Sequence, residues 1–199
     1  AKYANVKSTI ADGRFQLPNL QVFLMHRVYL FRDGIESNNY MLYFYNRNEY
    51  KMCISFEHCK FGSKGIDVDG PAYSVGELTQ SRLKSYVYIY YARMLSIRDC
   101  VINYAITGNS NNCYGIYCYF PEILHVEDVK VYSPLSYSSY SYCPLCLSEN
   151  SDDGIECVIR NVSQELIFNG TYEYIPSLIR VSGYLNAKIS NISINMGSR

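Results

Sequence analysis

The stretch Leu95-Ser96-Ile97-Arg98-Asp99-Cys100-Val101-Ile102 follows the pattern apolar-x-apolar-x-x-apolar-x-apolar, and five more copies lie along the chain. The six copies begin at Phe23, Ile54, Leu95, Leu124, Cys157 and Ala187. Apolar residues fill 23 of the 24 pattern positions, with Gln164 as the exception, although only 48% of the chain is apolar. Most spacings are 29 to 33 residues, which favours a solenoid over a propeller, whose blades take about 40.

Each half of the pattern alternates with the period of a half-buried strand, not with that of a helix. Two residues separate the halves, so a straight chain would turn the second half inside out, and the chain must bend there. In four copies the residue before the second half is Asp or Asn, which tolerate the left-handed backbone of such a bend. The bend residues are Asp99, Asp128, Asn161 and Asn191, with Arg27 and His58 in the other two copies.

A short alternating run precedes five of the copies and predicts a third strand in each coil. These runs are residues 41–45, 87–91, 116–120, 145–147 and 179–181. Repeats this short leave no room for crossover helices, so the coils should stack in parallel. We expect an all-β parallel β-helix of about six coils with three short strands each, over residues 15–196 of a single domain, 1–199. The longest spacing, 41 residues, predicts an insertion at Gly62 to Leu78.

Three units carry a family resemblance, namely residues 97–102, 126–131 and 189–194. With their turn asparagines and aspartates they resemble the right-handed parallel β-helix, the pectate-lyase-like solenoid. The resemblance covers roughly residues 15–196, and it implies the right-handed winding. It specifies a fold and not a function.

The formal charge is zero, with 18 basic and 18 acidic residues, so nothing favours nucleic acid or an anionic membrane as a partner. No apolar stretch approaches the roughly 18 residues of a membrane span. The strand pattern and Arg27 argue against a leader peptide in the apolar stretch at residues 20–31. Residues 1–14 and 197–199 offer little to cap a coil, so we expect a fragment of a larger chain or an oligomer. The sequence indicates no cofactor.

Eight cysteines suggest disulfides between stacked coils, because the spacing of coils suits a disulfide. Cys59 and Cys100 share a pattern position in consecutive copies, and a second group could bridge Cys118 to Cys143 or Cys146. That group also includes Cys113. Free buried thiols are the alternative for both sets. The spacing of Cys143 and Cys146 could form half of a zinc site, but no second such pair exists, so no metal is expected.

Three Asn-x-Ser/Thr sequons occur, at Asn161, Asn169 and Asn191. Two of them are bend residues of the repeat, so fold requirements alone explain them. Asn169 lies in a turn-like stretch and is the better glycan acceptor. The 22 tyrosines, the absence of tryptophan and the many Ser and Asn residues are typical of an extracellular, cell-surface or virion protein.

Carboxylates are the candidates for catalysis, since a β-helix enzyme acting on polysaccharide needs an acid and a base some 5 to 10 Å apart. Asp67 and Asp69 alternate on one strand face, and Glu127 is the third candidate. A hairpin surface explains the aspartates equally well. Asp128 has the role of a bend residue, and the pair at 152–153 has the composition of a solvated loop. The three histidines form no triad in the sequence.

The tyrosines indicate a function more strongly than the carboxylates do. In residues 86–91 the alternation points Val87, Ile89 and Tyr91 inward, and it points the remaining tyrosines outward. The outward set is Tyr86, Tyr88 and Tyr90, with Tyr117 and Tyr119 in the next coil and Tyr43 or Tyr45 in an earlier one. Tyrosine suits the binding of sugars or proteins, although it is also a common strand former. The Tyr/Ser stretch at 132–142, with Tyr137 and Tyr140, is either a binding loop or a linker.

Two functions follow from these patterns. The first is a non-enzymatic structural and interaction module of a cell-surface or virion appendage, such as a spike, an adhesin or a filament subunit. Its partners would be subunits of the same assembly or surface glycans. The second is a polysaccharide lyase or glycoside hydrolase, which should gather at least two carboxylates and a basic residue in one groove.

Overall fold

The computed structural model describes residues 4–8, 21–32, 42–44, 52–63, 85–103, 114–134, 143–147, 154–167 and 177–196. Within these ranges every regular element is a strand, which confirms the all-β class. The strands are β1 (Ala4–Ser8), β2 (Val22–His26), β3 (Val28–Arg32), β4 (Leu42–Phe44), β5 (Cys53–Glu57), β6 (Lys60–Ser63), β7 (Ser85–Arg98), β8 (Val101–Asn103), β9 (Tyr114–Pro134), β10 (Cys143–Cys146), β11 (Gly154–Ile167), β12 (Ile179–Arg180) and β13 (Tyr184–Met196).

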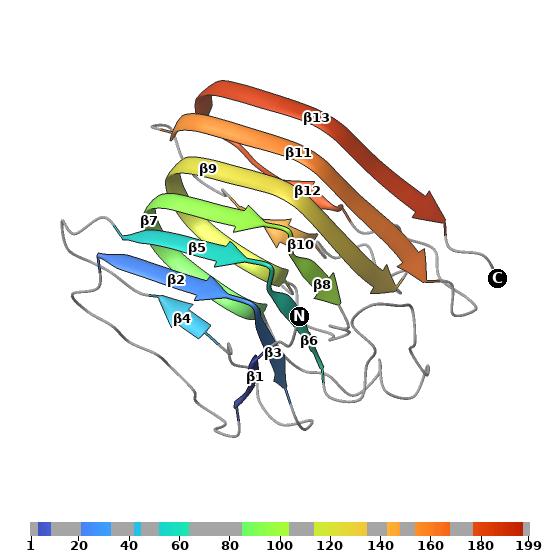
Figure 1. Cartoon of the computed structure of the whole chain (residues 1–199). Coiled ribbons are helices and arrows are strands. Elements are labelled where there is room, and N and C mark those ends of the chain that lie inside the picture. Colours follow the sequence, from blue (N-terminus) through green and yellow to red (C-terminus); the bar gives the residue numbers. More distant parts are fainter. Residues whose placement is uncertain are drawn as a thin grey trace.

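The first halves of the six pattern copies form one side of a parallel stack. Its strands follow the order β2, β5, β7, β9, β11 and β13 (Figure 1). Phe23 lies opposite Ile54 and Ile54 opposite Leu95, and this register continues through Leu124 and Cys157 to the last copy. Each pattern position therefore stacks on itself, which confirms that the repeat builds a parallel β-solenoid.

The predicted bends are confirmed at all six copies. Within the described part of the chain, the non-glycine residues with positive φ, between 49° and 55°, are Arg27, His58, Asp99, Asp128, Asn161 and Asn191. This left-handed conformation turns the chain between the two halves, so both apolar pairs face the same interior. The bend side chains also pair along the stack. The amide of Asn161 donates to Asp128 over 2.8 Å, and that of Asn191 donates to Asn161 over 2.9 Å.

Two further sides complete the coils. On the second side, the second halves pair in the order β3, β6, β8 and the later parts of β9, β11 and β13, and β1 pairs with β3 at the end of this side. The third side consists of β4, the first part of β7, the first part of β9, β10 and β12. These strands confirm the runs predicted upstream of the copies. Gly62 and Ser63 belong to β6, so the predicted insertion begins later than Gly62, and its remainder lies outside the described residues.

The count of six complete coils is not supported. The described residues follow the chain without a break through all three sides only in residues 85–103, 114–134 and 177–196, which make about three turns. The other copies contribute sides that are separated by stretches outside the described ranges. The six copies nevertheless lie in one ladder, so the repeat and its register are independent of the coil count.

Tyr91 does not point inward as the alternation predicted. It is 41% exposed, while Ile89 before it and Ala92 after it are buried. Two residues instead of one separate these inward positions, so the chain turns a corner here, without the positive φ of the six bends. The period-2 rule fails at such a corner because it holds only along a straight strand.

The interior changes character along the stack. Phenylalanines fill the end near the first copies, where the rings of Phe23 and Phe44 lie 4.8 Å apart and those of Phe56 and Phe61 lie 5.5 Å apart. Smaller side chains, mostly Val, Ile, Leu and Cys, fill the later coils. Gln164, the one polar residue of the pattern, is also fully buried.

We expect the substitution Leu95→Ala to lower the free energy of unfolding by about 3 kcal/mol, because it removes buried methyl groups and leaves a cavity. Leu24→Ala is the matched control, since Leu24 is exposed on an outward position of the same side, and we expect it to cost less than about 0.5 kcal/mol. Urea denaturation of both variants measures the difference. Equal losses would contradict the assignment of pattern positions to the interior.

Substitutions of Arg27 test the bend, because Arg27 has a long side chain and nevertheless adopts a positive φ. Arg27→Val should cost about 1–2 kcal/mol of unfolding free energy, since a β-branched residue is strained at positive φ. Arg27→Gly should be nearly neutral, because glycine adopts this conformation without strain but loses more chain entropy on folding. Denaturation curves in which the valine variant is as stable as the glycine variant would exclude the bend.

Candidate functional site

Outward side chains of the ladder β5, β7, β9 and β11 line a groove, which we call the ladder groove. Its volume is about 460 Å³. The inward positions beside it are buried, so its walls are rigid strands and its polar lining comes from the positions between apolar ones. The lining residues are Ser55, Glu57, Met94, Ser96, Arg98, His125, Val126, Glu127, Val158 and Arg160.

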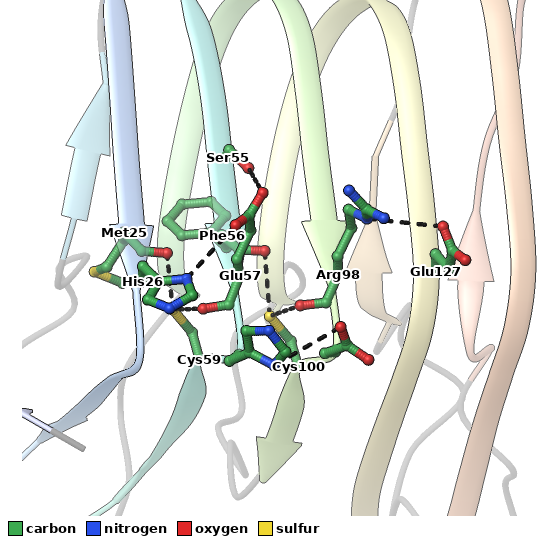
Figure 2. A network of polar contacts seen from close by, with 11 residues as sticks. Met25, His26, Ser55, Phe56, Glu57, Cys59, Arg98, Cys100 and Glu127 are labelled. Atoms are coloured by element: carbon green, nitrogen blue, oxygen red, sulfur yellow. Dashed lines mark hydrogen bonds and ion pairs between the residues drawn. The ribbon is translucent and has the colours of Figure 1, made fainter. Parts of the chain in front are cut away.

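A row of polar side chains meets at this groove, and its charged members Glu57, Arg98, Glu127 and Arg160 alternate in sign. His26 Nδ1 lies 3.5 Å from the carboxylate of Glu57, and Arg98 Nε lies 3.7 Å from that of Glu127 (Figure 2). Arg160 donates a hydrogen bond to the same Glu127 carboxylate from the other side. The five residues occupy one pattern slot in consecutive copies, so the parallel register itself brings opposite charges together.

Glu127, a predicted catalytic candidate, therefore lies in the groove, but its partner is not one that the sequence indicated. Glu57 occupies the same slot two strands away, at a main-chain separation of about 10 Å from the spacing of strands. The hydroxyl of Ser55 lies 3.5 Å from the Glu57 carboxylate. Sequence reasoning missed Glu57 because each copy contributes one charge; aligning that slot across the copies would have found it.

The histidines do not form a catalytic group. His58 lies 3.7 Å from the carboxylate of Asp99, and its ring meets that of His26 edge-on at 5.2 Å between centroids. His125 Nε2 is 3.9 Å from the carboxylate of Glu156. All three side chains lie beside carboxylates, and no serine or cysteine nucleophile contacts them among the residues that the structure describes. They add polar contacts to the outer face.

The seven cysteines within the described ranges carry free thiols, so the structure does not support the predicted bridges. Cys59 and Cys100 do occupy neighbouring rungs, as predicted (Figure 2). Their thiols instead contact main-chain oxygens, Cys59 that of Met25 at 3.2 Å and Cys100 that of Arg98 at 3.2 Å. The Cys100 thiol hydrogen bond lowers the pKa of Cys59, and burial raises the pKa of Cys100 well above its usual value.

The other predicted bridge joins side chains that belong to different clusters. Cys118 packs in the main core, whereas Cys143 and Cys146 pack with Tyr117 in a second, smaller cluster. Burial raises the pKa of the Cys118 thiol far above its usual value, that of Cys143 to about 12 and that of Cys157 to about 11. These thiols stay protonated and unreactive at neutral pH. Cys113 lies outside the described residues.

The predicted tyrosines stack in two rows on the third side, and we call them together the tyrosine stack. Tyr88 stacks on Tyr43 and Tyr117, with ring centroids 5.2 and 4.7 Å apart, and Tyr90 stacks on Tyr119 at 5.2 Å. Tyr117 is only 6% exposed, so the exposed sheet that the sequence predicted is interrupted at its centre. Packing against Cys143 and Cys146 of the next coil is the reason.

Several predicted site residues lie outside the described residues or have undescribed side chains. They are Tyr86, Tyr137, Tyr140, Cys113, Asp67, Asp69 and Asn169. The sequons at Asn161 and Asn191 are described, and the Nδ2 atom of each already donates to a neighbouring bend residue. A glycan at either nitrogen would break this ladder.

Another outward contact lies on the second side. Lys130 Nζ is 3.7 Å from the Glu165 carboxylate and 4.7 Å from the centre of the Tyr132 ring. The contact with Tyr132, followed in size by smaller effects of Glu165, raises the pKa of Lys130.

The described residues contain no group of three or more side chains suited to a metal ion. None of them forms a helix long and apolar enough to span a membrane.

Comparisons of the chain with models of protein families, with curated proteins and with solved structures find no match. The fold is therefore established from the strand pairing of this chain, and the function has to be argued from its surface.

The buried thiols predict a loss of stability in alkali. Because burial raises the pKa of Cys118 from 9.0, the folded protein keeps a proton that the unfolded chain releases above about pH 9. This contribution is complete below about pH 9 and is lost as the pH rises toward the folded pKa. We expect Cys118→Ala to lose unfolding free energy less steeply than the natural chain above about pH 9, by up to about 1.4 kcal/mol per pH unit.

Urea denaturation from pH 7 to 11 measures both slopes. A Leu145→Ala variant is the control, because Leu145 is buried but carries no titratable group, and its slope should equal that of the natural chain. Parallel curves for Cys118→Ala and the natural chain would contradict the prediction.

Proposed function

We propose that the protein is a non-enzymatic structural and interaction module of a cell-surface or virion appendage, namely a spike, an adhesin or a filament subunit. The observation that carries the proposal is the tyrosine stack, in which rings from successive coils form rows on a rigid parallel sheet. The proposal includes an extracellular location and an oligomeric state. It also includes a right-handed winding, because parallel crossovers are right-handed in about 98% of cases.

The stacking supports a recognition role for two physical reasons. Ring contacts between rungs hold the tyrosines in one arrangement, so little rotamer entropy is lost when a ligand binds. The ring faces between neighbouring tyrosines of a row are covered by stacking, so along the row a ligand meets ring edges and the hydroxyl ends of the side chains. A repeating row of edges and phenol groups suits a partner with its own repeating hydroxyls, and we propose a surface glycan as the ligand of this side.

The alternative is a polysaccharide lyase or glycoside hydrolase, and one observation favours it. Glu57 and Glu127 line one groove, their main chains are about 10 Å apart, and Arg98 lies on the strand between them, which is compatible with the two-carboxylate arrangement of inverting glycosidases. We rank the enzymatic function below the structural one because of the contacts that these carboxylates make. Glu127 is held by two arginines and Glu57 by His26 and Ser55, so their oxygens are occupied by the protein itself.

We expect Tyr90→Ser combined with Tyr119→Ser to abolish glycan binding, because both rings of one row are lost. Binding to an array of neutral and acidic oligosaccharides is the measurement. Tyr29→Ser, on a different side of the coil, is the matched control and should bind as the natural chain does. If the double variant still binds the same glycans with the same affinity, the tyrosine stack is not the recognition surface.

The same oligosaccharides test the enzymatic alternative, which predicts that the natural chain shortens one of them. We expect no shortening of any oligosaccharide by the natural chain, as measured by mass spectrometry of the products. Shortening that disappears in Glu57→Gln combined with Glu127→Gln, and persists in Glu165→Gln on another side, would replace the proposed function with the hydrolase.

A further inference from the structure

Tyr91 stands apart from the tyrosine stack, at the corner where the chain turns from the third side to the first. Its side chain is 41% exposed. Its ring lies 4.8 Å from that of Tyr90 at 88° and 6.3 Å from that of Tyr119 at 86°, and the ring of Phe120 lies 5.7 Å away at 60°. No ring among the described residues is parallel to it. Edge contacts therefore hold the Tyr91 ring, and no stacked neighbour covers it.

Arg93 lies beside this ring. Tyr91 and Arg93 are the exposed residues on either side of the buried Ala92, so their Cα atoms are within about 7 Å of each other. Arg98, on the same strand, pairs with Glu127, whereas Arg93 pairs with no described side chain. The Tyr91 hydroxyl likewise has no hydrogen-bond partner among the described residues. The corner thus presents an aromatic ring and hydrogen-bond donors that the described part of the fold does not use.

The next coil adds an acceptor of opposite charge. The register of β7 on β9 sets Ala92 beside Pro121, so the residues that follow, Arg93 and Glu122, share one slot on neighbouring rungs, about 4.8 Å apart at the main chain. Glu122 is partly buried. One cation and one anion balance, so this slot of the corner carries no net charge. It offers donors from Arg93 and acceptor oxygens from Glu122, which suits an uncharged ligand rich in hydroxyl groups.

We propose that Tyr91, Arg93 and Glu122 form the anchoring site for the glycan, which we call the corner site, and that its ligand is an uncharged pyranose. The C–H face of the pyranose packs on the exposed ring of Tyr91. Adjacent hydroxyls accept hydrogen bonds from the Arg93 guanidinium and donate to the Glu122 carboxylate. The inference rests on the proposed glycan binding and deepens it by naming the class of sugar and the residues that hold it.

The position of the corner site suits an extended glycan. Tyr90 and Tyr119, one row of the tyrosine stack, contact the Tyr91 ring. Sugars that follow the anchored one therefore meet the ring edges and hydroxyls of that row. An acidic sugar fits less well, because its carboxylate is attracted by Arg93 but repelled by Glu122 one rung away.

Titration calorimetry tests the corner site with short oligomers of glucose, mannose and galactose, and with oligomers of glucuronic acid as the charged comparison. We expect at least one neutral oligomer to bind. Tyr91→Ala should raise its dissociation constant at least about tenfold, whereas Tyr91→Phe, which keeps the ring, should raise it no more than about threefold. Arg93→Ala should raise it about tenfold, because hydrogen bonds from a charged group are lost.

Lys188→Ala is the matched control for Arg93→Ala, since Lys188 is an exposed cation on β13 and its loss should leave binding unchanged. Urea denaturation verifies that every variant is folded. An unchanged affinity of Tyr91→Ala or of Arg93→Ala would overturn the corner site. Tighter binding of the glucuronic acid oligomers than of every neutral oligomer would overturn the uncharged ligand.

The outcomes separate the corner site from the proposed function. If Tyr90→Ser with Tyr119→Ser abolishes binding and Tyr91→Ala does not, the tyrosine stack remains the recognition surface and the corner site is wrong. If Tyr91→Ala abolishes binding and the double variant binds as the natural chain does, the corner site stands and the role of the stack is wrong. A natural chain that binds none of the oligomers removes both.

Discussion

The left-handed bend inside each pattern copy is the constraint on which the rest of the structure depends. Six residues adopt φ values of 49° to 55°, and each turns the chain so that the apolar pairs on either side of it face one interior. Without the turn, the second pair would face solvent. Because every copy turns at the same slot, the coils stack in register, and a residue type placed in one slot is repeated along the whole ladder.

This register explains why the outer surface is organised in rows. Slots between the apolar positions carry no packing requirement, so each row can hold a different chemistry: charges of alternating sign in the ladder groove, amides and carboxylates at the bends, and aromatic rings in the tyrosine stack. In a globular enzyme such groups would have to be assembled from distant loops. Here strand spacing alone sets them about 5 Å apart, which favours extended, repetitive partners over small molecules.

Sequence patterns predicted the repeat, the bends and the third strand of each coil, because these depend on local alternation. They failed for Tyr91, where an unrecognised corner shifted the alternation, and for Tyr117, which neighbouring-coil residues bury. The cysteines show a related limit. Cys59 and Cys100 were correctly placed on neighbouring rungs, but their thiols contact main-chain oxygens rather than each other as a disulfide.

The amino-acid sequence by itself determined the solenoid and its register, since an apolar pattern that recurs every thirty or so residues has few other ways to bury itself. Tertiary structure alone decided which outward groups meet. Glu57 and Glu127 are 70 residues apart, and no local signal joins them; they share a groove because two turns of chain return to the same side. The outward position of Tyr91 was decided in the same way, because it depends on where the coil turns from one side to the next.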